Sequence, residues 1–173
     1  DIINSKKGKK SSYDLSVTKK RVLITMGSLG ASTINEKIFN MAKSFKNKTY
    51  EVLLVTGKDN FDDINKDSVP DNVKIVPYIE NMGEVLKFTD LIITRAGATI
   101  ISEILTLGIP SIMIPSPYVS NNHQVFNANY LKEKGASKVM EEKDFDEDLL
   151  LKEIEDILND NKLYKQMSEN ANL

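Results

Sequence analysis

Short apolar runs of strand length recur along this chain, and amphipathic stretches of helical length separate them. Parallel strands need long crossover connections, usually helices, and they are apolar throughout because both faces of their sheet are covered. Apolar runs that alternate with amphipathic segments therefore predict repeated strand–helix units. We predict an α/β chain built on a Rossmann-like, doubly wound parallel sheet.

The bounds of the expected elements follow from where these runs begin and end. Glycine favours the conformation that ends a helix, and proline cannot continue one. The expected strands are Arg21–Thr25, Tyr50–Val55, Val73–Val76, Leu91–Thr94, Ser111–Pro115 and Ala136–Met140. The expected helices cover Ile34–Phe45, the segment from Gly97 to Leu107, Asn122–Lys134 and two segments after Glu147, with short helical segments after the second and third strands.

The bulk composition limits the function. With 173 residues, of which 40% are hydrophobic, the chain fits one domain that buries its own core. Its formal net charge of −2 argues against a general nucleic-acid binder, which needs a basic face to displace counterions from phosphates. We therefore expect no nucleic-acid partner, whereas a small anionic ligand stays open.

Several kinds of site are excluded by residue type. The chain has no cysteine, which excludes disulfides, thiolate metal sites and cysteine nucleophiles, and it has one histidine, His123, which excludes histidine pairs. No apolar run approaches the roughly 20 residues of a membrane-spanning helix, so we expect a soluble chain. The polar, basic start predicts that residues 1–20 are a linker or a severed connection from a missing N-terminal domain.

Glycines follow the first expected strand directly. Gly27, Ser28 and Gly30 lie between this strand and the next expected helix. Glycine permits a tight turn and a close backbone approach, and free N–H groups at such a turn can face an anion. The pattern lacks the full dinucleotide fingerprint and a P-loop lysine. The sequence leaves two interpretations of this loop open: a phosphate site and a purely structural turn.

A second loop of small residues follows the fourth expected strand. Arg95, Gly97, Ala98, Thr99 and Ile100 lead into a helix, so a second helix N-terminus would point into the same cleft. Glu103 falls within the first turns of that helix. Its carboxylate either compensates the helix dipole at the surface or accepts both hydroxyls of a ribose.

The connection after the fifth expected strand is long and polar. It runs through Pro115-Ser116-Pro117-Tyr118 to His123 and Gln124, and its hydroxyl and amide groups suit sugar recognition. The sequence leaves three interpretations of His123 open: a helix cap, a ligand contact, or an exposed residue without a role.

Further on, Asp144 and Asp146 have the Asp-x-Asp spacing of a metal site. They open a terminal helix, however, where acidic side chains interact favourably with the helix dipole. We expect no metal.

Taken in order, these segments resemble a known family. The loop Gly27–Ala31, the segment Tyr78–Met82, the stretch from Thr94 to Pro110, and His123-Gln124 with Asn127-Ala128 look like the C-terminal domain of MurG-type glycosyltransferases of the GT-B fold. The resemblance covers Arg21 to the end. Met26, Leu29 and His123 depart from the residues that the family commonly shows, which puts the sugar contacts in doubt more than nucleotide binding.

The resemblance implies that residues 21–173 form a UDP-sugar-binding domain for UDP-N-acetylglucosamine. It places uracil at backbone groups near Ile79, with Met82 lining the pocket or belonging to the core. It places ribose at Glu103, diphosphate at the loops of Ser28 and Ala98–Ile100, and the sugar at His123 and Gln124. It implies no cofactor.

The resemblance also implies what the chain lacks. Such enzymes act with inversion on an undecaprenyl-diphosphate-linked muramoylpentapeptide at the cytoplasmic face of the bacterial membrane. The general base, the acceptor site and the membrane contact belong to the family's N-terminal domain, so the catalytic residue is unknown and this chain is expected to be inactive alone. The alternatives are the donor domain, or a separate subunit, of another GT-B UDP-sugar transferase. A Rossmann dehydrogenase is disfavoured because no acidic residue closes the second strand, which ends Leu54-Val55-Thr56-Gly57.

Overall fold

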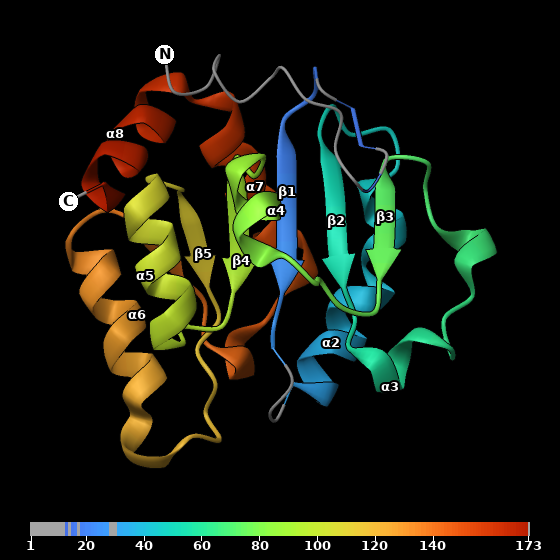
Figure 1. Cartoon of the computed structure of the whole chain (residues 1–173), viewed down its shortest axis with the longest axis horizontal. Helices are drawn as coiled ribbons and strands as arrows, with labels where there is room; N and C mark the ends of the chain where they lie inside the picture. Colours follow the sequence, from blue (N-terminus) through green and yellow to red (C-terminus); the bar gives the residue numbers. More distant parts are fainter. Residues whose placement is uncertain (1–12, 14, 17, 28–30, 173) are drawn as a thin grey trace.

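The computed structural model describes residues 13, 15–16, 18–27 and 31–172 and shows one parallel sheet covered by helices on both faces (Figure 1). The strand order is β3-β2-β1-β4-β5-β6, and every neighbouring pair is parallel. The strands are β1 (Arg21–Thr25), β2 (Glu51–Val55), β3 (Val73–Val76), β4 (Leu91–Thr94), β5 (Ser111–Met113) and β6 (Ser137–Val139). The predicted fold class is confirmed.

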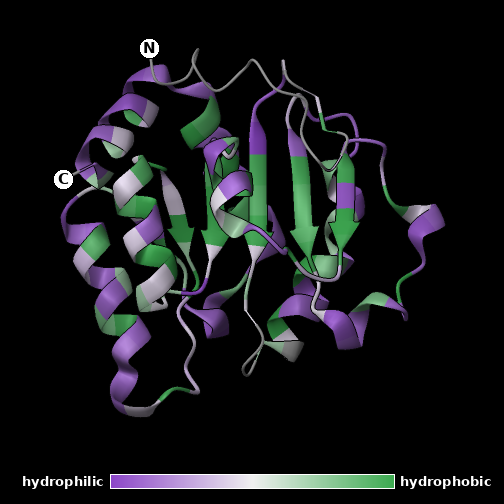
Figure 2. Cartoon of the chain, in the orientation of Figure 1, coloured by the Kyte–Doolittle hydropathy of each residue, from purple (hydrophilic) through white to green (hydrophobic). Residues whose placement is uncertain are grey.

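Two separate cores lie on the two faces of this sheet, because successive side chains of a strand point to opposite sides. Val22 and Ile24 of β1 belong to one core, and Leu23 between them belongs to the other. The first core takes residues from α2 (Ser32–Asn40) and α7 (Glu147–Asn159), and the second from α4 (Met82–Lys87), α5 (Ala98–Leu107) and α6 (His123–Glu133). Figure 2 shows the resulting hydrophobic strands beneath helices whose outer sides are mostly hydrophilic.

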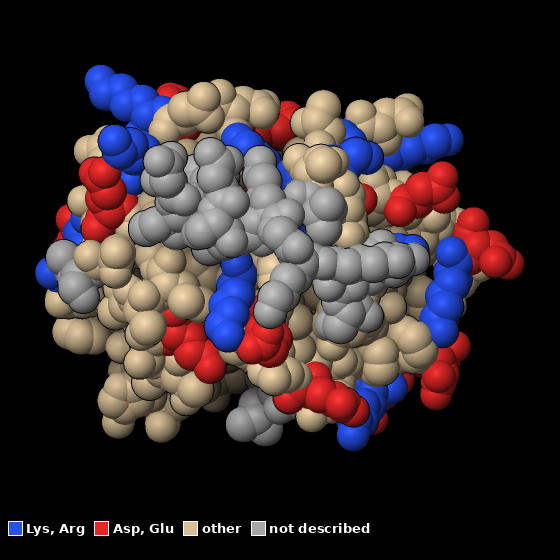
Figure 3. Space-filling model, turned by 45° about the horizontal axis from the view of Figure 1, so that its top comes forward, with Lys and Arg blue, Asp and Glu red and all other residues tan. Residues whose placement is uncertain are grey.

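The remaining elements complete the layers. The last helix, α8 (Asn161–Ala171), contributes Tyr164 and Met167 to the first core and Ala171 to the second. Short elements fill the connections: η1 (Ala42–Phe45), α3 (Lys58–Phe61), η2 (Lys66–Ser68), η3 (Ser120–Asn122) and η4 (Glu142–Asp144). Where the strands begin, Lys and Arg lie among Asp and Glu on the face shown in Figure 3, so the described residues there form no field of a single sign.

Several predicted elements are shorter than the sequence indicates. The helix expected over Ile34–Phe45 ends at Asn40 and gives way to η1, because the Met41 N–H bonds to both the Lys37 and Ile38 carbonyls and the turn tightens. The strand expected to reach Pro115 ends at Met113. The ladder continues only through the Ile114 N–H, which donates to the Thr94 carbonyl at 2.8 Å, and proline has no N–H to extend it. The second and sixth strands are also trimmed at their ends.

Gly108 ends α5 as predicted and also seats the last helix. Its φ of 64° is left-handed, and the Ile109 N–H closes the helix on the Ile104 carbonyl. Ser168 Oγ of α8 donates to the Gly108 carbonyl at 2.6 Å. A Cβ at this position would lie 3.1 Å from the Ser168 carbonyl oxygen.

Gly108→Ala is therefore expected to destabilise the chain by about 1–3 kcal/mol, because alanine is strained at positive φ and presses on the α8 backbone. The melting temperature, followed by circular dichroism, should fall by about 2–10 °C. Gly83→Ala is the matched control, since Gly83 lies inside α4 and a Cβ there would be 3.6 Å from its nearest neighbour. An unchanged melting temperature for Gly108→Ala would contradict the role of Gly108 in ending α5 and seating α8.

Candidate functional site

The connections that follow β1, β3, β4 and β5 leave the sheet at one edge, the lower edge in Figure 1. In open parallel sheets this edge binds ligands, above all where the strand order reverses. Here the chain passes from β1 to β2 and β3 on one side and returns to β4 on the other side of β1. Thr25 pairs with Thr94, so the loops after β1 and β4 start side by side.

The loop after β1 requires glycine at its second residue. Gly27 has a φ of 73°, a conformation that other residues rarely adopt. Ala31 is buried and provides the N-cap of α2, and its carbonyl accepts from the Asn35 N–H at 2.8 Å. Ser28 and Gly30 lie outside the described residues. A phosphate contact by this loop stays a prediction.

The loop after β4 presents the N-terminus of α5 to the same edge. Gly97 is the N-cap, and no side chain in the described part of the chain caps this end of the helix. The first N–H groups of a helix have no intrahelical partner and carry the positive end of its dipole. Ala98 and Thr99 are exposed, and Ile100 is half-buried against the second core. This end of α5 can therefore receive an anion.

Glu103 follows one and a half turns later in α5. It is half-buried and forms no hydrogen bond or ion pair with any residue of the described chain. Its carboxylate is thus available to a ligand beside the helix N-terminus. Ribose binding by Glu103 stays a prediction.

Gln124 and Asn127 of α6 hold the loop after β4. Gln124 Oε1 accepts from the Ala96 N–H at 3.2 Å and from the Ser116 N–H at 2.8 Å. Asn127 Nδ2 donates to the Ala96 carbonyl at 3.0 Å, so both polar groups of one peptide residue are fixed. The resemblance implied a sugar contact by Gln124, which stays a prediction. The structure commits the oxygen to the backbone and leaves the Nε2 group for a ligand.

His123 is the first residue of α6 and is exposed. The helix has no side-chain cap hydrogen bond, so the capping interpretation of His123 gains no support. The preceding Asn121 and Asn122 have φ values of 58° and 50°, which asparagine tolerates better than most residues. This turn presents His123 to solvent at the same edge as Gln124.

Ile79 and Met82 belong to the connection between β3 and α4. Ile79 is buried in the second core, so only its backbone is available to a base. Met82 begins α4, is half-buried and packs against the same core. Asn81 caps this helix by accepting from the Glu84 N–H at 3.2 Å. Uracil binding at this connection stays a prediction.

Arg95 points into the protein. It is 5% exposed, and its Nη1 group donates to the carbonyls of Ile114 and Pro115, each at 3.2 Å. Its Nη2 atom lies 2.9 Å from Oε2 of Glu142, which is also buried. The guanidinium thus has internal partners, and direct contact of Arg95 with a ligand stays a prediction. Glu142 was missed by the sequence analysis, because a glutamate inside an acidic run carries no local sign of burial.

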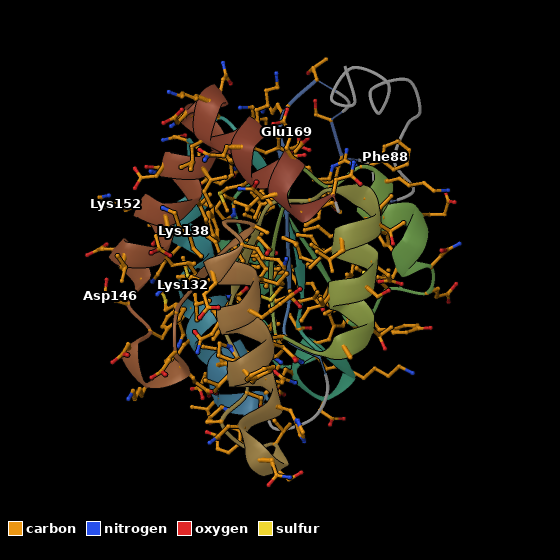
Figure 4. The ribbon with its side chains drawn as sticks, turned by 90° about the vertical axis from the view of Figure 1, so that its left-hand side faces the viewer. Phe88, Lys132, Lys138, Asp146, Lys152 and Glu169 are labelled. Carbon is orange, nitrogen blue, oxygen red and sulfur yellow. The ribbon has the colours of Figure 1, made fainter. Side chains whose placement is uncertain are left out.

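The acidic run Asp144–Asp148 has a structural explanation. Asp146 lies on the outside at the start of α7, and its carboxylate accepts from the Leu149 N–H at 2.8 Å as a helix cap (Figure 4). Within the described ranges, no group of three or more His, Asp or Glu side chains is placed to hold a metal ion.

Comparison with known proteins agrees with this fold. Residues 21–173 match the family model described as the glycosyltransferase family 28 C-terminal domain. The chain belongs to glycosyltransferase family 28. Its fold is similar to Acinetobacter baumannii MurG, with a TM-score of 0.75 and 24% identity over 98% of this chain and 48% of that one. It is also similar to the spinosyn rhamnosyltransferase SpnG complexed with thymidine diphosphate, with a TM-score of 0.72 and 19% identity over 95% and 44% of the two chains.

Two Bacillus proteins are similar in sequence to this family 28 chain. Each is named a UDP-N-acetylglucosamine–N-acetylmuramyl-(pentapeptide) pyrophosphoryl-undecaprenol N-acetylglucosamine transferase. The protein of Bacillus cytotoxicus is 48% identical over 90% of this chain and 43% of its own length. The protein of Bacillus cereus is 45% identical over 95% of this chain and 46% of its own length. The chain thus spans about half the length of the curated relatives it matches. The resemblance to MurG-type transferases and the expected half of a GT-B fold are confirmed.

The two neighbouring residues at the start of α6 should respond differently to truncation. Gln124→Ala leaves two backbone N–H groups without their acceptor, and we expect it to lower the free energy of unfolding by about 1–3 kcal/mol. His123→Ala removes an exposed ring and should change stability by less than about 0.5 kcal/mol. Urea unfolding of both variants measures the difference. Equal free energies of unfolding for the two variants would show that the hydrogen bonds accepted by Gln124 do not stabilise the chain.

Proposed function

We propose that this chain is the donor-binding domain of an inverting glycosyltransferase that moves N-acetylglucosamine from UDP-N-acetylglucosamine to an undecaprenyl-diphosphate-linked muramoylpentapeptide. The observation that carries the proposal is the identity of 48% and 45% with two Bacillus proteins named for this transfer. The open N-terminus of α5, with Glu103 beside it, supports the donor-binding part.

The donor is assigned group by group along the ligand-binding edge. The N-terminus of α5 and the loop after β1 receive the diphosphate, because backbone N–H groups and the helix dipole favour an anion there. Glu103 accepts the ribose hydroxyls, and backbone groups near Ile79 hold the uracil. Gln124 Nε2 and the His123 ring contact the sugar.

The chemistry of this half is stabilisation of the leaving group. As the acceptor hydroxyl attacks the anomeric carbon, the bond to the diphosphate breaks and negative charge grows on UDP. N–H groups fixed before the reaction stabilise that charge, each by a few kcal/mol, without reorganising during the step. The group that accepts the hydroxyl proton is assigned to the other half of the longer enzyme, with the acceptor and membrane contacts.

The proposed location follows from that division. The whole enzyme would act at the cytoplasmic face of the bacterial membrane as a peripheral protein in peptidoglycan synthesis. None of the helices in the described part of this chain has the length and apolar character that crossing a bilayer requires. We propose that membrane contact is made outside this chain.

Calorimetric titration tests donor binding. The chain should bind UDP-N-acetylglucosamine in preference to UDP-glucose and should not bind NADH. Glu103→Ala should weaken binding at least about 10-fold, since hydrogen bonds to a charged group contribute about 1.5–3 kcal/mol. Glu169→Ala is the control, because Glu169 is an exposed carboxylate on α8, near the opposite edge (Figure 4). Full binding by Glu103→Ala would overturn its role, and absence of any UDP-sugar binding would count against the donor-domain proposal.

A second candidate is the donor domain of another GT-B sugar transferase. It is favoured by Met26, Leu29 and His123, which depart from common family residues, and by the fold shared with a rhamnosyltransferase complexed with thymidine diphosphate. Tighter binding of thymidine diphosphate than of UDP in the same titration would support this candidate.

A further inference from the structure

The connection between β4 and α5 is held from both faces of the sheet. On the α6 face, Gln124 and Asn127 bind the backbone of Ala96. On the opposite face, the side chain of Arg95 binds the end of β5 and reaches Glu142 in η4. Arg95 thus links the ends of β4, β5 and β6, whose residues Thr94, Met113 and Val139 are paired in register.

Glu142 places a charged carboxylate in a buried position, which is unfavourable for stability. Its side chain is 7% exposed, and its Oε1 atom is buried with no hydrogen-bond partner among the residues that the structure describes. The desolvation free energy of a buried charged pair is about as large as the attraction between its charges. A protein with an apolar pair of similar volume in the same place is often at least as stable. Stability alone therefore does not account for a carboxylate here.

The surroundings indicate what the ion pair holds. A hollow of about 460 Å³ lies between α2, the β5–α6 connection and η4, lined among others by Thr33, Pro115, Asn122 and Glu142. The exposed part of the β5–α6 connection, at Pro117 and Tyr118, borders this hollow, whereas the base of the connection is buried, with Ile114 in the first core. At that base the carbonyls of Ile114 and Pro115 accept the two hydrogen bonds from Arg95, and Glu142 pairs with the other side of the same guanidinium.

We propose that Glu142 is a positioning residue that acts through Arg95 to hold the β4–α5 connection, and with it the N-terminus of α5, in the geometry that binds the donor diphosphate. The inference rests on the proposed function for its ligand. Glu142 itself touches no donor group. Its contribution is that the Ala96–Ala98 backbone is already in place before the donor arrives.

The test compares Glu142→Ala and Glu142→Gln with Glu141→Ala and Glu141→Gln. Glu141 is the matched control, because it is adjacent, exposed and paired on the surface with Lys143 at 3.1 Å. The affinity for UDP is measured by calorimetry, and hydrogen exchange of the unliganded chain is measured for peptides covering residues 94–101 and for the central strands. Glu142→Ala should raise the Kd for UDP and speed exchange in residues 94–101, each at least about 10-fold. Glu142→Gln retains an oxygen for Arg95 and should recover most of both.

Each other outcome is decisive. Unchanged exchange in residues 94–101, or faster exchange throughout the central strands to the same degree, overturns the positioning role. Faster exchange with unchanged UDP affinity also overturns it. If the unaltered chain binds no UDP, the proposed function fails, while local exchange still decides whether Glu142 holds the loop.

A second variant covers the case in which Glu142→Ala does not fold. The double substitution Arg95→Met with Glu142→Leu replaces the ion pair by an apolar pair and should melt at a higher temperature than Glu142→Ala, because it leaves no buried charge without its partner. The positioning role predicts that it still binds UDP about 10-fold more weakly. Restored stability together with full UDP affinity would show that the pair is only a structural contact.

Discussion

The pairing of β1 with β4 is the contact on which the candidate site depends. These strands are neighbours in the sheet although two complete strand–helix units separate them in the chain. Their register, with Thr25 opposite Thr94, places the Gly27 turn and the Gly97 helix start next to each other at the reversal of strand order. Each of the two glycine-containing loops is weak evidence for an anion site when it is taken alone. The pairing of β1 with β4 makes the two loops adjacent at one edge of the sheet, so together they are stronger evidence.

The sequence predicted the elements well because their signals are local. Four-residue apolar runs such as Leu91–Thr94 gave buried strands, and Gly108 ended α5 in the left-handed conformation that glycine favours. Helix and strand ends were less predictable where hydrogen bonding decided them. The tightening of the chain after Asn40 depends on which carbonyl the Met41 N–H selects, and apolar periodicity continues unchanged through that point.

The site was predictable in outline and not in its polar pairing. Sequence pattern placed Gln124 near the ligand-binding edge, but it could not show that its oxygen bonds to the Ala96 and Ser116 backbones. Nor could it pair Arg95 with Glu142, 47 residues later, since the direction of a side chain after a strand end depends on how the chain leaves the sheet. Nor could it show that the buried Arg95 side chain donates to the Ile114 and Pro115 carbonyls.

An anion site built from backbone N–H groups makes stricter demands than one built from lysine. A lysine side chain has a flexible stem that follows its ligand, whereas a peptide N–H moves only if the main chain moves. Among the described residues no side chain caps the N-terminus of α5, and the direction of its N–H groups follows from where the helix backbone is held. Ala96, just before this turn, is held by Gln124 and Asn127, and the side chain of Arg95 anchors the residue before it. In the proposed site, the residues of this frame would therefore affect anion affinity through the position of the N–H groups, although none of the frame bonds needs to reach the ligand.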